Sequence, residues 1–107
     1  LTIGYTNHTM EKYVSIALLS LELEISGCRS LKEKRGRLAA VLSRVRQEFN
    51  VAAAETGHQD AWQFALLSIT TVSNDPDHNR QVLQKVCEFV ESRFPDEPVI
   101  SYTIENR

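Results

Sequence analysis

The chain contains few of the residues that would cross-link it covalently or break it into loops. Its 107 residues include two cysteines, three prolines and four glycines. Cys28 and Cys87 are too few for a disulfide framework, and they lack the paired spacing of a zinc site. This use of cysteine favours a reducing, cytoplasmic setting over secretion.

Long hydrophobic runs are also missing. No stretch approaches the roughly 18 consecutive apolar residues of a membrane-spanning helix. The first residues lack the basic segment followed by an apolar run that marks a secretory signal. We therefore predict a soluble cytoplasmic protein that has no membrane partner.

Residues 1–12 show no hydrophobic periodicity. We interpret them as a flexible lead or an expression remnant, with Met10 as a candidate natural start. Residues 13–107 are then expected to form a single domain. A chain of 107 residues with 42% hydrophobic composition suits one hydrophobic core and is too short for two.

From residue 13 to residue 25 the hydrophobic pattern has a period of two, which predicts a half-buried β-strand. Alternate positions are apolar from Leu19 onward. Val14, Ile16 and Leu18 add apolar residues of the opposite parity, so the first half of this strand is apolar on both faces. Two explanations stay open: a partner subunit covers the second face, or a β-bulge near Leu18-Leu19 exchanges the two faces.

The clearest helix start follows the turn at Ser26-Gly27. Ser30 and Glu33 have the spacing of a capping box, in which each side chain accepts a hydrogen bond from the other residue's backbone. Apolar residues then recur at helical spacing and predict an amphipathic helix. They are Leu31, Leu38, Val41, Leu42, Val45 and Phe49.

The remaining segments predict a hairpin, a second helix and a last strand. They are a strand at 51–55, a turn at 56–60, a strand at 62–72, a helix at 76–94 and a strand at 99–105. Asp75 before Pro76 is typical of a helix start, because the proline lacks only an N–H that would stay unpaired there. The βαββαβ order predicts an α+β, two-layer ferredoxin-like sandwich with an antiparallel four-stranded sheet and both helices on one face.

Four runs carry a resemblance to a known family: RSLKEKR at 29–35, FNV at 49–51, DAWQ at 60–63 and ND at 74–75. They are similar to segments of the YlxP-like bacterial proteins, a family of unknown function. The resemblance extends from Tyr13 to Glu105 and implies a ferredoxin-like fold. Genes of this family often lie beside those for translation initiation and ribosome maturation factors, which implies a ribosome-associated role. Gly36 departs from the family pattern, in which a helix former is usual.

Positive charge is concentrated in the first helix. Residues 29–46 hold seven basic residues and one acidic residue, a net charge of +6, whereas the rest of the chain holds five basic and thirteen acidic residues, a net charge of −8. A basic surface of this kind attracts phosphate, nucleic acid or an acidic protein. Because the helix macrodipole is positive at the same end, these side chains are destabilising unless an anion lies near them.

Two sources of that negative charge remain open. The first is an external phosphate or RNA, bound by the loop before the helix and by the basic side chains around it. The predicted anion- or RNA-binding residues are Arg29, Ser30, Lys32, Lys34, Arg35 and Arg37. The second source is intramolecular: carboxylates of the same chain pair with these side chains, the candidates being Glu22, Glu24, Glu55 and Asp60.

We therefore expect a small, non-enzymatic cytoplasmic protein, an RNA- or ribosome-associated binding module whose partner is rRNA or a ribosomal particle. The alternative is a homo-oligomeric domain, most simply a homodimer, that uses the open sheet face and has no nucleic-acid role. Its predicted interface residues are Val14, Ile16, Leu18, Trp62 and Phe64. Base stacking on that face is disfavoured, because the glycine-aromatic motif of RNA-recognition modules is absent.

Enzyme chemistry has little support in the sequence. Cys28 lies beside arginines at a helix start, where a thiol can be activated. A phosphatase loop needs an arginine six positions after its cysteine, and that position holds Lys34. An acylphosphatase would use an arginine and an asparagine, here Arg29 and Asn74, but its glycine-rich loop is missing. The three histidines have no metal-ligand spacing, so neither a metal nor a cofactor is predicted.

Overall fold

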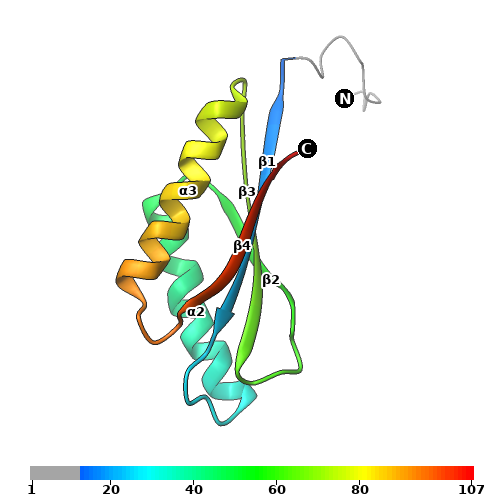
Figure 1. The fold of residues 1–107 in the computed structure, drawn as a ribbon. Coiled ribbons are helices and arrows are strands. Elements are labelled where there is room, and N and C mark those ends of the chain that lie inside the picture. Colours follow the sequence, from blue (N-terminus) through cyan, green and yellow to red (C-terminus); the bar gives the residue numbers. More distant parts are fainter. Residues whose placement is uncertain (1–12) are drawn as a thin grey trace, which may run out of the picture.

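Six elements follow one another in βαββαβ order in the computed structural model, which describes residues 13–107 (Figure 1). They are β1 (Ser15–Glu24), α2 (Leu31–Glu48), β2 (Ala52–Gly57), β3 (Phe64–Ser73), α3 (Pro76–Arg93) and β4 (Val99–Asn106). The interpretation of residues 1–12 as a flexible lead lies outside the described residues.

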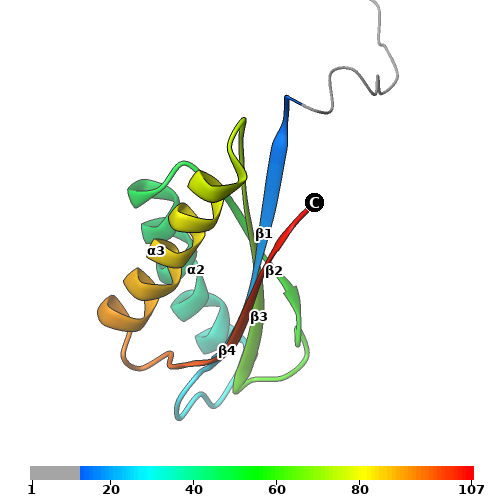
Figure 2. The same cartoon turned by 45° about the horizontal axis from the view of Figure 1, so that its top comes forward.

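The strands form one antiparallel sheet in the order β2-β3-β1-β4. Both helices cover the same face of this sheet, and the other face is open (Figures 1 and 2). The predicted ferredoxin-like α+β sandwich is therefore confirmed. The predicted hairpin strands are shifted slightly: β3 begins at Phe64, so Trp62 lies in the loop before it and not on the strand.

The core is built from alternate residues of the two central strands, β1 and β3, on the face that the helices cover. Leu19 and Leu21 of β1 pair with Ile69 and Leu67 of β3, and all four side chains are buried beneath the helices. Pairing between β1 and β3 continues from Ser15 to Glu24 without a register shift. The alternative of a β-bulge near Leu18-Leu19 is therefore wrong, and the opposite parity of β1 faces the open side of the sheet.

The first helix begins where the sequence predicted. The Ser30 hydroxyl accepts a hydrogen bond from the Glu33 backbone N–H at 3.0 Å, which satisfies one of the N–H groups that a helix start leaves unpaired. Glu33 does not complete the capping box, because its carboxylate accepts a hydrogen bond from Arg37 at 3.2 Å. The helix buries Leu38, Val41 and Val45 against the sheet.

The second helix is fixed to the sheet by a buried asparagine. Asp75 caps the helix, with its carboxylate accepting from the Asp77 N–H at 3.0 Å. Asn79 is fully buried; its amide donates to the Ser15 carbonyl at 3.0 Å and its amide oxygen accepts from the Ser73 hydroxyl at 2.7 Å.

Within residues 13–107, neither helix is both long and apolar enough to cross a bilayer.

Candidate functional site

The start of α2 gathers the residues that the sequence singled out, and the structure divides them into two groups. The chain leaves β1 through a turn at Gly27, whose φ of +68° suits glycine, and enters α2 at the Ser30 cap. From there, successive residues of the first two turns point in different directions. Two of the predicted anion-binding cations turn back onto the protein, and three turn outward.

Lys34 is not part of the surface. Its side chain is 2% exposed, and its Nζ donates to the carbonyl oxygens of His58 at 2.6 Å and Ala61 at 2.7 Å. Nζ also lies 2.9 Å from Glu55 Oε2, an ion pair rather than a well-angled hydrogen bond, since this buried oxygen has no hydrogen-bond partner among residues 13–107. The prediction that Lys34 binds an external anion is wrong for this conformation: Glu55, one of the four carboxylates proposed as internal partners, already holds it.

The burial of Lys34 has a signal in the sequence that was missed. Its position falls between Leu31 and Leu38 in the three-four spacing of the apolar stripe, so the backbone directs it toward the sheet. Asn79 occupies the same kind of position in α3, ahead of Leu83. A polar residue in a stripe position is buried together with its neighbours and needs internal partners.

Arg37 also turns toward the protein, but its partners belong to other segments than those of Lys34. Its guanidinium donates to the carbonyl oxygens of Ser26 at 2.8 Å and Asp96 at 2.9 Å, and it lies 3.6 Å from the buried carboxylate of Glu97. Burial lowers the pKa of Arg37, but the carboxylates of Glu97 and Glu33 stabilise the charged guanidinium, outweigh burial and raise the pKa. Arg37 thus joins α2 to the loop between α3 and β4 and is committed to holding the fold together.

The cations that turn outward are Arg29, Lys32 and Arg35, which we call the cation row. All three are exposed, and none has an ion pair or side-chain hydrogen bond within residues 13–107. They follow one another at three-residue intervals from the residue before the Ser30 cap into the second turn of α2. This end of the helix carries the positive end of the macrodipole, so three positive charges stand here without internal compensation.

The open sheet face has the opposite charge. Glu22, Glu24 and Glu105 lie on its strands, and the described strands carry no lysine or arginine. The Glu22 carboxylate accepts a hydrogen bond from the His58 ring nitrogen Nε2 at 3.0 Å. Serine and threonine hydroxyls occupy the middle of the face, where Thr56 and Ser68 are 2.7 Å apart. A phosphate backbone would be repelled from this face.

The predicted interface residues do not come together as one patch. Ile16 and Leu18 lie near the beginning of β1, where Ile16 pairs with Val72, and Val14 precedes them. Phe64 pairs with Glu24 at the far end of the same strands, and Trp62 lies beyond it in the loop. Sequence reasoning missed Val72, which is 64% exposed beside Ile16.

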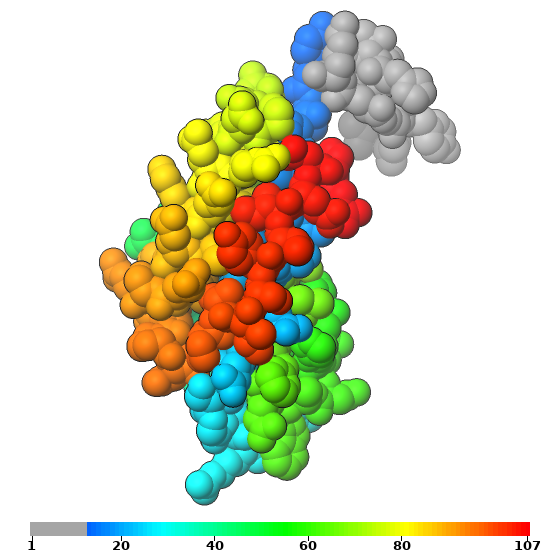
Figure 3. All heavy atoms as spheres, in the orientation of Figure 1, coloured from blue at the N-terminus to red at the C-terminus, as the bar shows by residue number. Residues whose placement is uncertain are grey.

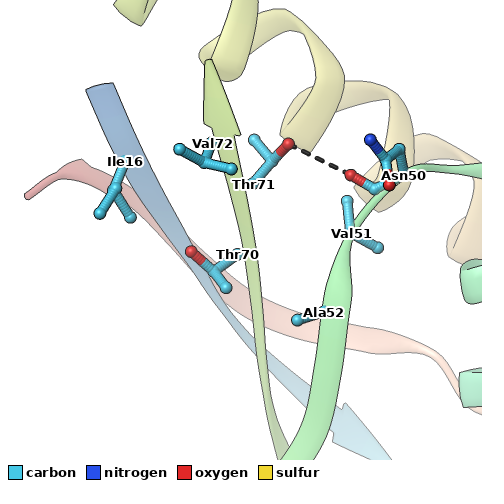
Figure 4. Close-up of a pocket in the computed structure, with 7 residues that line it drawn as sticks. All are labelled: Ile16, Asn50, Val51, Ala52, Thr70, Thr71 and Val72. Atoms are coloured by element: carbon cyan, nitrogen blue, oxygen red, sulfur yellow. Dashed lines mark hydrogen bonds between the residues drawn. The ribbon is translucent and has the colours of Figure 1, made fainter. Parts of the chain in front are cut away.

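A shallow groove of about 410 Å³ marks the apolar end of the open face (Figure 4). It lies where β3 continues past the beginning of β2, and the Thr71 hydroxyl donates to the Asn50 carbonyl at 3.3 Å across its rim. Its lining residues are Ile16, Asn50, Val51, Ala52, Thr70, Thr71 and Val72. The lining combines the apolar side chains of Ile16, Val51 and Val72 with the uncharged polar groups of Asn50, Thr70 and Thr71.

Both cysteines are buried. Cys28 is 2% exposed, and its thiol donates to the Ser30 carbonyl at 3.3 Å, so the thiol chemistry considered from the sequence would first require the loop to open. On α3, burial raises the pKa of Cys87 to about 12, with a hydrogen bond and charge repulsion from Glu91 acting in the same direction.

A βαββαβ sandwich with both helices on one face defines a ferredoxin-like α+β domain. Residues 16–104 match the family described as "Protein of unknown function (DUF503)", and the chain belongs to that family. It is 40% identical over 81 residues to the uncharacterized protein YlxP of Bacillus subtilis (strain 168), a match that covers 76% of this chain and 87% of that protein. The resemblance to YlxP-like proteins is confirmed, and the family carries no assigned function.

Proposed function

We propose that this domain is a non-enzymatic, cytoplasmic binding module that associates with RNA, on rRNA or a ribosomal particle, through Arg29, Lys32 and Arg35. The observation that supports this proposal is that the basic residues at the start of α2 form two groups. Lys34 and Arg37 are saturated by internal partners, whereas the three side chains of the cation row have none within residues 13–107. The charge of the cation row is thus available to an outside anion.

The chemistry of the row suits a phosphate backbone better than a single small anion. Arginine binds phosphate oxygens in a two-pronged geometry, and lysine adds a flexible point charge. Lys32 and Arg35 are separated by about 4.5 Å along the helix axis, at about 1.5 Å of rise per residue, and Arg29 extends the row beyond the Ser30 cap. A row of this kind can contact successive phosphates of one strand, and such contacts position an RNA without reading its sequence.

The association should depend on salt in proportion to the number of phosphates neutralised. Three contacts give a slope of log affinity against log salt of roughly −2 to −3. The module should therefore bind RNA weakly alone at physiological salt. A second copy or a second partner would strengthen the attachment by avidity.

The direct test reverses the charge of the row. The variant Arg29→Glu/Lys32→Glu/Arg35→Glu is expected to lose co-sedimentation with ribosomal particles and salt-sensitive binding of RNA. The matched control Arg80→Glu/Lys85→Glu/Arg93→Glu changes the net charge equally at exposed positions of α3 and should retain both. Equal loss in the two variants would mean that total charge, not the row, governs binding. Unchanged co-sedimentation of the first variant refutes the proposal.

A second candidate function is protein association through the apolar end of the open sheet face. The observation that favours it is the exposure of Ile16 and Val72 side by side at the rim of the groove. The variant Val72→Lys should abolish such an association while leaving the RNA affinity of the single domain unchanged. An oligomer formed in this way would present several copies of the cation row.

A further inference from the structure

The two edges of the sheet differ in how they are protected. The β2 edge is six residues long and is interrupted by a register shift between Glu55 and Gly57. Arg46 of α2 reaches this edge and donates to the Ala53 carbonyl at 2.5 Å. Shortness, irregularity and an added cation are the devices by which proteins prevent further strands from joining a sheet.

The β4 edge has a register shift only near its start, where Glu22 pairs with Ser101 and Leu23 with Val99, and its pairing with β1 is regular from Ser101 to Asn106. It is eight residues long, and it has neither a charged residue nor a proline from Val99 to Ile104. Figure 3 shows its side chains running along the side of the molecule with no other element over them. Tyr102 is 50% exposed on this edge. A long, uncharged edge strand is a template for pairing with another strand.

The register of β4 shows which backbone groups are free to pair. The Arg107 N–H donates to the Ile16 carbonyl at 2.7 Å, so in this antiparallel pairing the residues at odd positions direct their hydrogen-bonding groups toward β1. Those of Tyr102, Ile104 and Asn106 point away from β1 because the direction alternates along a strand. They meet no backbone partner within residues 13–107.

We propose that β4 pairs antiparallel with β4 of a second copy of this chain, about a two-fold axis at Thr103, so that two four-stranded sheets become one sheet of eight strands. The proposal does not depend on RNA binding. It concerns a different surface from the cation row and from the apolar groove, and each of the three can fail separately.

The register follows from the outward groups. Residues whose backbone N–H and C=O groups point away from β1 must lie opposite residues of the same kind in the other copy. A pair centred on Thr103 meets this condition, because it places Tyr102 of each copy opposite Ile104 of the other. A contact between an aromatic and a β-branched side chain is one of the more stabilising cross-strand pairs. Centring on Tyr102 would instead set Asn106 opposite Pro98, which has no N–H to donate.

Charge also favours a second copy at this edge. In the Thr103-centred register Glu105 lies opposite Ser101, and no two like charges face each other. Packing two open faces together would instead bring the carboxylates of Glu22, Glu24 and Glu105 toward their own copies. Like charges brought together in this way are destabilising.

The expected dimer is weak and leaves the cation row accessible. One strand edge buries less than the roughly 800 Å² per partner of stable complexes, so dissociation in the micromolar range is expected. Because α3 lies over β4 and α2 over β2, the two α2 helices fall at the outer ends of the joined sheet. At about 4.8 Å per strand, they are separated by on the order of 30 Å.

Cysteine cross-linking tests the register. In the proposed pair Thr103 lies opposite itself in a non-hydrogen-bonded position, where the Cα atoms are about 4.5 Å apart and a disulfide can form. Thr103→Cys should give a disulfide-linked dimer under mild oxidation, which reductant reverses. Ser101→Cys is the matched control: it is equally exposed on the same strand, but it lies about 14 Å from its own copy at roughly 3.4 Å per residue. Absence of the Thr103→Cys dimer, or equal cross-linking at both positions, overturns the proposal.

Charge exchange tests the same contact at equilibrium. Thr103→Lys and Thr103→Glu should each weaken self-association about five-fold or more in sedimentation experiments, since each places like charges on the two-fold axis. An equimolar mixture of the two should associate again as a heterodimer. Ser101→Lys, which faces Glu105 of the other copy, should not weaken association. A wild-type chain that stays monomeric at several hundred micromolar contradicts the proposal. Self-association that persists in both Thr103 variants and is lost in Val72→Lys contradicts it too, because the contact would then lie at the apolar groove.

Discussion

The basic side chains on the two flanks of α2 have different roles. On one, Lys34 and Arg37 bind carbonyl oxygens and carboxylates of distant segments. On the other, Arg29, Lys32 and Arg35 face solvent. Lys32 and Lys34 are two residues apart, yet the first is exposed and the second is among the most buried residues of the protein. Angular position on the helix, rather than charge, decides whether a cation stabilises the fold or is available to a partner.

The largest expected effect comes from breaking the buried flank. Lys34→Met should cost about 3 kcal/mol of unfolding free energy, because it leaves the partly buried Glu55 carboxylate without its cation and two carbonyl groups unpaired. Lys32→Met, its exposed counterpart, should change stability by less than about 0.5 kcal/mol. Urea unfolding of both variants measures the difference. Adding Glu55→Leu to Lys34→Met should restore part of the loss, and a Lys34→Met variant of wild-type stability would contradict the assignment.

Arg37 and Arg35 provide a second comparison between the two flanks. Arg37→Ala should destabilise the domain by about 2 kcal/mol, since hydrogen bonds from a charged group to the Ser26 and Asp96 carbonyls are lost. Arg35→Ala should be nearly neutral for folding and should instead weaken RNA binding. Thermal unfolding together with an RNA-binding titration separates the two outcomes. If Arg35→Ala unfolds the domain as readily as Arg37→Ala, the division between the flanks is wrong.

Burial has a pH-dependent consequence at Cys87. The pKa of its thiol is raised from 9.0 to about 12 in the fold, so the folded state keeps a proton that the unfolded state releases above about pH 9. Stability should therefore fall as the pH rises from 9 toward 12, by about 1.4 kcal/mol near pH 10. Unfolding of the wild type compared with Cys87→Ala isolates this contribution. A difference between the two that stays constant from pH 8 to 10.5 would rule it out.

The smallest expected effect is a gain. Gly36 lies on the exposed face of α2, and a Cβ atom added there would meet nothing within 4 Å, so Gly36→Ala should stabilise the domain by about 0.5–1 kcal/mol. Gly57→Ala is the contrasting control, because its Cβ would meet Leu66 Cδ2 at 2.9 Å. Chemical unfolding of the two variants should give shifts of opposite sign. No gain for Gly36→Ala would indicate that the start of α2 is under constraints beyond helix propensity.

The fold could be predicted because its signals are local. The Ser30 cap, the Asp75-Pro76 helix start and the period-two pattern of β1 each depend on residues near one another in sequence, and the βαββαβ order follows from them. The division of the basic cluster was harder to predict. Lys34 falls at the spacing of the apolar stripe, but its partners lie on β2 and in the loop after it, more than twenty residues away in the sequence.

The other features that the sequence did not predict also depend on contacts between residues far apart in the sequence. Arg37 finds its partners at Asp96 and Glu97, and nothing near Arg37 in the sequence indicates them. The separation of Phe64 from Ile16 follows from strand register, which places them at opposite ends of the paired strands. Long-range contacts therefore determined which members of the predicted sites came together.

We propose that three cations, and not the five basic residues predicted from the sequence, contact an RNA partner. The most direct measurement is the salt dependence of affinity for a short structured RNA. The wild type should show a slope of log affinity against log salt of roughly −2 to −3. Arg29→Gln, Lys32→Gln and Arg35→Gln should each reduce its magnitude by nearly one. A slope that is the same in the wild type and in Arg29→Glu/Lys32→Glu/Arg35→Glu would show that RNA does not bind through the cation row.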